Sequence, residues 1–144
     1  MPSYKNKRLD TEALANIKIK IVKYRSPEKL LGFMYNTPVS ELRKSTHGGI
    51  DGEGKAHEYT FEHLIGSIRE NGCYGCAEPE KNSIHVWIGK NAKPDTVLEL
   101  MAHERGHLME PQYKNAMRDE VKAEQYALCA TFAFSVIKDF GLIK

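Results

Sequence analysis

Apolar and polar residues alternate with two different periods along the chain, which predicts both helices and strands. In residues 59–71 the apolar side chains recur every three or four positions, as on one face of a helix that an Asn-Gly pair ends. Residues 83–89 instead alternate one by one, and the PEKN turn before them predicts a hairpin over residues 73–89. Residues 17–24 alternate apolar residues with lysine and form a further candidate strand. Together these elements predict an α+β fold.

Capping residues indicate where the other helices begin. Ser26, followed by proline and glutamate, is typical of a helix N-cap, and Thr37 opens a similar signal. Asp95 is a candidate N-cap for a helix in the second half, and the last long helix is expected over Asp119–Asp139. Residues 46–58 are rich in glycine and polar side chains, so we expect an exposed loop there.

Composition indicates one domain over residues 1–144, because this length suffices for a single core. The 21 basic and 19 acidic residues nearly balance, which argues against a nucleic-acid binder. No apolar run approaches the roughly 20 residues that span a bilayer, so no membrane partner is expected. The polar N-terminus resembles no signal peptide, and three cysteines are too few for a secreted disulfide framework. A cytoplasmic protein is the expectation.

The stretch LELMAHERGHLM, residues 98–109, carries the most specific chemistry. His103 and His107 are four residues apart, so on a helix both imidazoles can reach one metal ion. Glu104 lies about 100° around the helix from His103, where a general base would meet a water beside the metal. Gly106 has no side chain and would let another backbone come close. A catalytic zinc needs a third protein ligand in addition to the histidines.

The helix downstream offers two candidates for that ligand, Glu120 and Glu124. They lie one turn apart on one face that otherwise carries alanine and threonine, so this face could pack closely on the histidine helix. Spacing alone permits either glutamate to bind the metal. The alternative is that both are ordinary solvated charges of a helix surface.

The two motifs together resemble those of the gluzincin metallopeptidases, and most of all the ImmA/IrrE-like group. HERGH at 103–107 and EVKAEQYA at 120–127 are similar to the patterns H-E-x-G-H and E-x-x-A-(N/D)-x-F-A. The resemblance implies a minimal zincin-like fold: a small mixed or antiparallel sheet, an active-site helix and a C-terminal helix that carries a glutamate ligand. It covers roughly residues 84–137. The first half of the chain resembles no family we can name.

The resemblance also implies a role for each matching residue. His103, His107 and Glu120 would bind one zinc ion per chain, and Glu104 would be the general base. Glu124 stands where the family has Asn or Asp, and it would hydrogen-bond a liganding histidine, His103. Such partners fix the imidazole tautomer and raise its basicity.

The function that follows is a zinc metallopeptidase acting on a peptide or protein, expected to be a specific intracellular one. The rival is a catalytically silent zincin-like module that binds or regulates a partner. The sequence leaves the oligomeric state open.

In zincins the substrate lies as an extra strand on the edge of the sheet. The strand at 83–89 is therefore expected to form the edge bordering the cleft, with His85 and Trp87 on the face away from the core helices. The alternative for Trp87 is that it covers a second small core. Tyr113, in the linker between the motifs, is a candidate stabiliser of the oxyanion, whereas Tyr126 is expected to pack in the core.

The remaining histidines and cysteines have weaker signals. Cys73 and Cys76 could form a redox pair or a second zinc site, but they precede a hairpin and are expected to be small strand residues. His47, His57 and His63 flank the glycine-rich segment and are expected at the surface, with a mobile lid as the alternative.

Overall fold

The computed structural model describes residues 18–50 and 52–143, and these form the α+β arrangement that the sequence predicts. No helix among these residues is long and apolar enough to cross a bilayer. The elements in chain order are β1 (Lys20–Lys23), α2 (Pro27–Met34), α3 (Val39–Leu42), β2 (Thr46–Ile50), β3 (Ala56–Thr60), α4 (Phe61–Asn71), β4 (Cys73–Glu78), the 3₁₀ turn η2 (Pro79–Lys81), β5 (Ser83–Ile88), α5 (Pro94–Leu108) and α6 (Ala116–Asp139).

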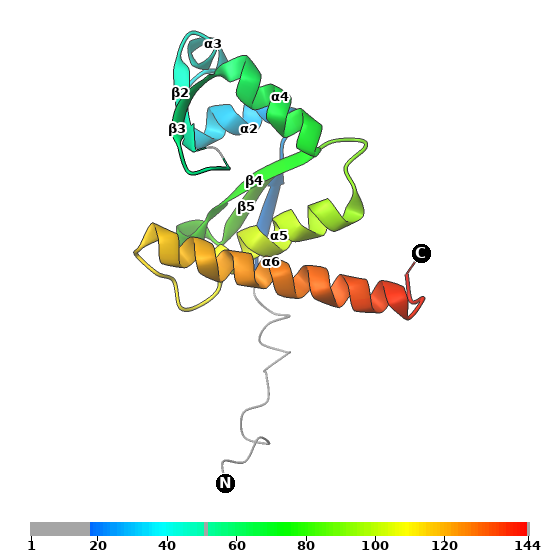
Figure 1. The fold of residues 1–144 in the computed structure, drawn as a ribbon. Helices are drawn as coiled ribbons and strands as arrows, with labels where there is room; N and C mark the ends of the chain where they lie inside the picture. The colour runs from blue at the N-terminus through cyan, green and yellow to red at the C-terminus, as the bar shows by residue number, and fades with distance from the viewer. Residues whose placement is uncertain (1–17, 51, 144) are drawn as a thin grey trace.

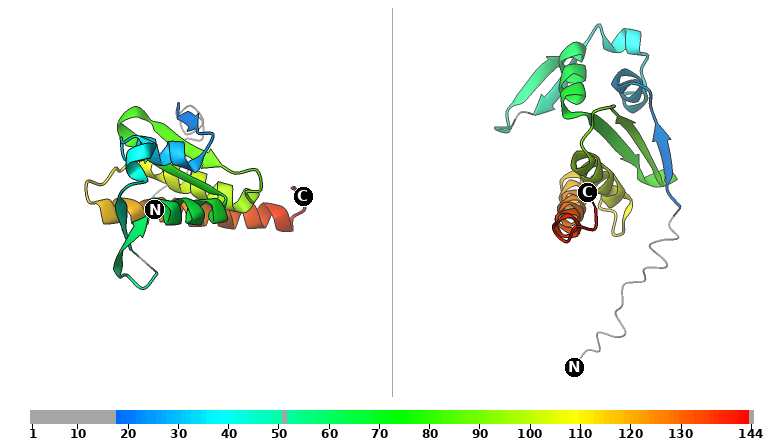
Figure 2. Two further views of the ribbon diagram at one scale, coloured as in Figure 1. Left: turned by 90° about the horizontal axis from the view of Figure 1, so that it is seen from above. Right: turned by 90° about the vertical axis from the view of Figure 1, so that its right-hand side faces the viewer.

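A three-stranded sheet with the order β1-β5-β4 separates two groups of helices (Figures 1 and 2). β5 pairs in parallel with β1 and antiparallel with β4. Helices α2 and α4 lie on one side of the sheet, and α5 and α6 lie on the other. The β2–β3 ribbon stands apart from this sheet, beside α4.

The alternation of β5 builds a core on each side of the sheet, which is the alternative considered for Trp87 in the sequence. Ile84 and Val86 are buried with Leu108 of α5. Trp87 points the other way and is buried against apolar residues of the first half of the chain. That second core consists of Leu30, Leu31, Leu42, Phe61, Ile65 and Ile68 with Trp87.

The expected position of β5 at the sheet edge is wrong. β1 and β4 pair with it on both sides, so neither His85 nor Trp87 lies on an edge strand. His85 is held instead by Glu78 Oε1 at 2.6 Å from Nε2 and by the Tyr24 hydroxyl at 2.8 Å from Nδ1. Alternation shows which side chains share a face, but not which strand comes from elsewhere to pair. The two edge strands are β1 and β4, and β4 is the edge strand that contacts α5.

Caps explain where the helices begin and end. Ser26 accepts from the Lys29 backbone N–H and Gly72 ends α4 at a φ of 93°, both as predicted. The prediction for Asp95 is wrong: α5 starts at Pro94, and Asp95 lies in its first turn. α6 begins three residues before the expected Asp119, because the Asn115 side chain accepts from the Arg118 N–H and caps it.

The glycine-rich segment also differs from expectation. Instead of a loop, residues 46–60 contain the paired strands β2 and β3, in register from Thr46 opposite Thr60 to Ile50 opposite Ala56. At Gly49 this ribbon leaves no room for a side chain, because a Cβ there would lie 2.7 Å from Cε2 of Tyr59.

α5 and α6 pack closely through small residues. A Cβ at Gly106 would lie 2.8 Å from Cα of Ala123, so the two backbones are nearer than any side chain there allows. Ala123 and Ala127 of α6 are completely buried in this contact. The prediction that Gly106 and the small residues of the second helix permit a close approach is confirmed.

We expect Gly106→Ala to destabilise the fold by about 1–3 kcal/mol, because the added methyl forces the helices apart. Gly66→Ala is the matched control, since a Cβ there meets nothing within 4 Å. Gly66 lies within α4, so its replacement should stabilise by about 0.5–1 kcal/mol. Urea unfolding followed by circular dichroism measures both changes. Equal effects of the two substitutions would contradict the close packing at Gly106.

Candidate metal centre

Three predicted ligands meet where α5 and α6 lie side by side (Figure 1). The Nε2 atoms of His103 and His107 are 3.3 Å apart. The Glu120 carboxylate is 3.2 Å from the first and 2.9 Å from the second. Among residues 18–50 and 52–143, these three side chains are the only group placed to hold a metal ion.

The other nitrogen of each imidazole faces a carboxylate. Nδ1 of His103 is 2.6 Å from Oε1 of Glu124, and Nδ1 of His107 is 2.7 Å from Oδ2 of Asp119. An ionised carboxylate only accepts hydrogen bonds, so each Nδ1 must carry the proton. In a neutral imidazole the lone pair is then on Nε2, which is the tautomer that binds metal.

The converging atoms therefore fit a divalent metal. Two lone pairs and a carboxylate point at one another, and this set contains no hydrogen-bond donor. A cation satisfies such a set, and two histidines with one glutamate are the ligands of a known class of catalytic zinc sites. Tetrahedral bonds of about 2.0–2.1 Å put ligand atoms about 3.3 Å apart, close to the separations found here.

Asp119 is a site residue that the sequence reading missed. Besides His107, it accepts from the Tyr113 backbone N–H at 3.2 Å and pairs with Lys122 at 3.0 Å. Although burial opposes ionisation, hydrogen bonds from His107 and Lys122 hold the pKa of Asp119 at about 2. The sequence did contain a signal for this role. Asp119 directly precedes Glu120, so it lies in the first turn of the same helix and within reach of the histidines.

Lys122 is a buried cation that ties this cluster together. It is 8% exposed, and its ammonium donates to the carbonyls of Met109 at 2.6 Å and Pro111 at 2.9 Å. These carbonyls belong to the segment joining α5 to α6. The same side chain thus holds the connecting segment and the Asp119 carboxylate that positions His107.

Glu104 lies in the same cleft as the histidines and is 7% exposed. Burial raises the pKa of its carboxyl to about 7, with Glu120 contributing and the two histidines opposing. The cleft has a volume of about 590 Å³. Apart from the metal-site residues, its lining consists of Met34, Tyr74, Gly75, Cys76, Ala77, Pro79 and Leu100.

The structure places the tyrosines differently from expectation. The ring of Tyr113 lies against the Arg118 guanidinium, 4.6 Å from its centroid, and is not part of the cleft lining. Tyr126 packs on Gly106 but stays 39% exposed, so it is only partly a core residue. Tyr74 of β4 is the tyrosine that lines the cleft, and sequence reasoning missed it. Burial, followed by Tyr35 and Glu104, raises the pKa of its phenol.

The cysteines and remaining histidines take no part in the metal group. Cys73 is buried, whereas Cys76 lines the cleft as a thiol whose pKa burial raises to about 11. Both are residues of strand β4, as expected. His57 and His63 are exposed as predicted. His47 is instead half-buried, with Nε2 3.1 Å from the Leu42 carbonyl oxygen.

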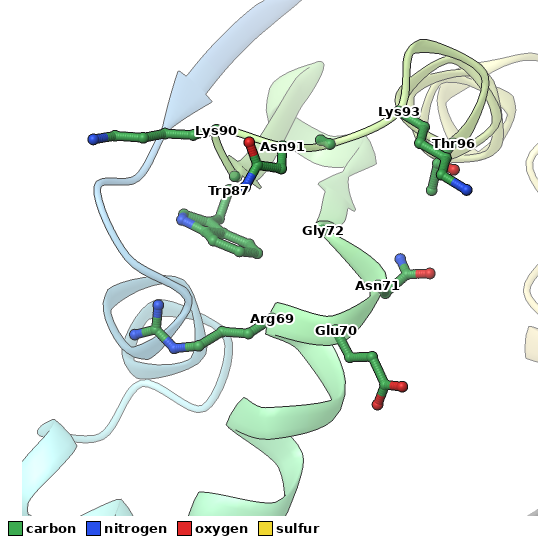
Figure 3. A pocket seen from close by; sticks show the side chains of 11 residues that line it. Arg69, Glu70, Asn71, Gly72, Trp87, Lys90, Asn91, Lys93 and Thr96 are labelled. Carbon is green, nitrogen blue, oxygen red and sulfur yellow. The ribbon is translucent and has the colours of Figure 1, made fainter.

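A second hollow of about 480 Å³ lies away from the metal group, between α4 and the start of α5 (Figure 3). Figure 3 shows the indole of Trp87 between the side chains of Arg69 and Lys90. The Arg69 guanidinium is already engaged, at 2.6 Å from Glu28. Trp87 thus lines this second hollow and belongs to the second core, and it does not line the cleft beside the histidines.

Comparisons with known proteins leave the family open. No family model, no curated protein and no solved structure matches the chain. The likeness to the gluzincins therefore stays a prediction that rests on the motifs at 103–107 and 120–127.

Removing different carboxylates of the site should lower the affinity for zinc by different amounts. Glu120→Ala removes an atom that faces both Nε2 atoms and should nearly abolish tight binding. Glu124→Ala and Asp119→Ala each remove a partner of an Nδ1 and should weaken binding about 10–100-fold. Competition titration with a chromophoric chelator measures all three, with the exposed Glu62→Ala as the unaffected control. A metal-free Glu124→Ala protein with normal binding by Glu120→Ala would reverse the assignment.

Proposed function

We propose that this chain is a zinc-dependent metallopeptidase of the gluzincin type, acting on a peptide or protein substrate. The observation that carries the proposal is the meeting of two imidazole Nε2 atoms with the Glu120 carboxylate beside a buried Glu104. His103, His107 and Glu120 would hold the zinc. When bound, zinc would polarise the scissile carbonyl and lower the pKa of a water beside it.

Glu104 is the proton carrier in this proposal. Its carboxylate lines the same cleft as the three ligands, so it can accept a proton from the attacking water. The same carboxyl then donates that proton to the leaving amine, which returns Glu104 to its starting state. Glu124 and Asp119 keep the imidazoles in the required tautomer throughout.

Strand β4 is the surface on which an extended substrate would lie, in place of the β5 edge that the sequence predicted. It is one of the two edge strands of the sheet, and Gly75 and Ala77 of β4 line the cleft. In an antiparallel pair, every second residue directs its backbone N–H and C=O toward the neighbouring strand. Gly72 is such a residue, because its carbonyl accepts from Gly89 N–H. Gly75 and Ala77 are an odd number of residues further along, so their backbone N–H and C=O point away from β5. An added peptide strand can pair with such groups.

Glu104→Gln should abolish cleavage while zinc content stays at one ion per chain. The amide has nearly the shape of the carboxyl but cannot take up a proton, so a loss of at least about 100-fold is expected. The zinc-loaded protein is incubated with a peptide library, and new termini are detected by mass spectrometry. Unchanged turnover in the variant would refute the mechanism. Bound zinc without cleavage by the wild-type chain would favour the catalytically silent module.

A matched pair of tyrosine variants tests which phenol stabilises the oxyanion. Tyr74 lines the cleft and Tyr113 packs on Arg118, so we assign this role to Tyr74. Tyr74→Phe should lower kcat about 100–1000-fold with little change in KM, the usual cost of losing one oxyanion donor. Tyr113→Phe should leave both constants unchanged. The opposite pattern would restore the role to Tyr113.

A further inference from the structure

The cleft beside the histidines continues along α5. A smaller hollow of about 200 Å³ adjoins it, since Leu100 and His103 line both. This middle hollow in turn adjoins the second hollow, shown in Figure 3, since Asn71 and Thr96 line both. The three hollows therefore form one groove from the metal-site residues to the start of α5, which we call the long groove.

One face of α5 forms the floor of the long groove. Thr96, Leu100 and His103 follow one another at spacings of four and three residues, so their side chains lie on the same side of the helix. From His103 back to Lys93 the helix axis covers about 15 Å. An extended peptide needs about four to five residues for this distance, at roughly 3.3 Å each. The far end of the groove is thus within reach of the fourth or fifth residue beyond a scissile bond at the metal site.

The direction of β4 indicates which end of a substrate enters the far part of the long groove. A Cβ on Gly72 would lie 3.3 Å from Cα of Ala92, and one on Gly75 would lie 3.7 Å from Cδ1 of Leu100, so β4 and α5 run the same way. Antiparallel strand pairs are slightly more stable per residue than parallel ones, so a peptide added to β4 is expected to run against it. The residues on the C-terminal side of its scissile bond then lie toward Lys93.

The far end of the long groove is basic. Its lining includes Arg69, Lys90 and Lys93 against one carboxylate, that of Glu70. The Arg69 guanidinium already pairs with Glu28 at 2.6 Å. Both lysines are exposed, and Figure 3 shows them on the segment that leads into α5. Their ammonium groups can therefore meet the negative charge of a ligand in the groove.

The loop between β5 and α5 fixes these lysines at the start of β4. Gly89 N–H donates to the Gly72 carbonyl at 2.8 Å, and Ala92 N–H donates to the Gly89 carbonyl at 3.2 Å. Ala92 also packs on Gly72. Because the backbone that carries the lysines is already tied to the sheet, a ligand that binds there does not have to order this loop.

The middle hollow has the opposite charge. Its lining includes the carboxylates of Glu99 and Glu124. Glu124 is engaged at 2.6 Å by Nδ1 of His103, whereas Glu99 is exposed. An acidic residue placed directly after the scissile bond would meet this like charge, which disfavours it. The long groove therefore favours negative charge at its far end and not in its middle part.

We propose that the long groove selects peptides with acidic side chains at the fourth and fifth positions after the scissile bond, where Lys93 and Lys90 pair with them. This inference rests on the proposed peptidase function and names its class of substrate, an extended internal segment of a protein that is acidic on its C-terminal side. Lys90 and Lys93 determine specificity and take no part in breaking the bond.

Peptide hydroxamates test the charge preference without any need for cleavage. The hydroxamate binds zinc, and the attached chain, leucine followed by Ala-Ala and then by Glu-Glu or Lys-Lys, extends on the C-terminal side. Calorimetric titration of the zinc-loaded protein should show about tenfold tighter binding of the Glu-Glu form at low salt. An exposed ion pair contributes up to about fivefold, and a repulsion of similar size replaces it in the Lys-Lys form. The difference should shrink in about 0.5 M salt, which screens exposed charges.

Charge reversal at the far end should change this preference. Lys93→Glu should abolish it, and the double variant Lys90→Glu/Lys93→Glu should favour the Lys-Lys form. Both variants should keep the zinc content and the unfolding midpoint of the wild type, since the two lysines are exposed. Lys114→Glu is the matched control, because Lys114 is exposed in the segment that follows the other end of α5. It should keep the wild-type preference.

The outcomes separate this specificity from the peptidase function. Equal affinity for the two forms, a preference that survives in the double variant, or binding of neither form would overturn the proposal. If the protein nevertheless cleaves peptides in a way that depends on Glu104, the peptidase function stands without this specificity. A preference that follows the lysines without cleavage of any peptide would support the long groove as a binding site for acidic peptides and count against the peptidase function.

Discussion

The close contact of α5 and α6 at Gly106 is the constraint on which the site depends. Carboxylates on α6 can reach imidazoles on α5 only if the two backbones nearly touch, and Gly106 against Ala123 permits this. One helix then supplies both imidazoles, while the other supplies every carboxylate that contacts them. A bulkier residue at either position would lengthen all of these distances at once.

Within that contact, each polar group has two tasks. Glu124 and Asp119 join the helices and also select the histidine tautomer, while Lys122 compensates the charge of Asp119 and fixes the preceding segment. Burying such a network costs desolvation free energy, and this cost is offset only when every polar group has a hydrogen-bond partner. No buried side-chain nitrogen or oxygen among the described residues lacks a partner. The hydrogen bonds that orient the two imidazoles are therefore complete on the Nδ1 side.

The sequence predicted what depends on local spacing and failed where distant segments meet. Helical periodicity put His103 and His107 on one face and Glu120 with Glu124 on another, and the two faces meet. Which glutamate lies between the Nε2 atoms was implied by the resemblance and not by spacing. The pairing of β1 with β5 has no local signal, so the edge strand was misassigned. Asp119 was overlooked because its role depends on a lysine and a backbone N–H from the linking segment.

Strand β5 has a consequence for how the molecule comes apart. The side chain of Val86 lies in one core and the side chain of the next residue, Trp87, lies in the other, so β5 is part of both cores. If β5 detaches from the sheet, both cores lose buried side chains at the same time. Partial opening that exposes one core alone is thus disfavoured, and unfolding should be a single cooperative transition. Helices α5 and α6, which carry the candidate ligands, thus share the stability of a region that contributes none of these ligands.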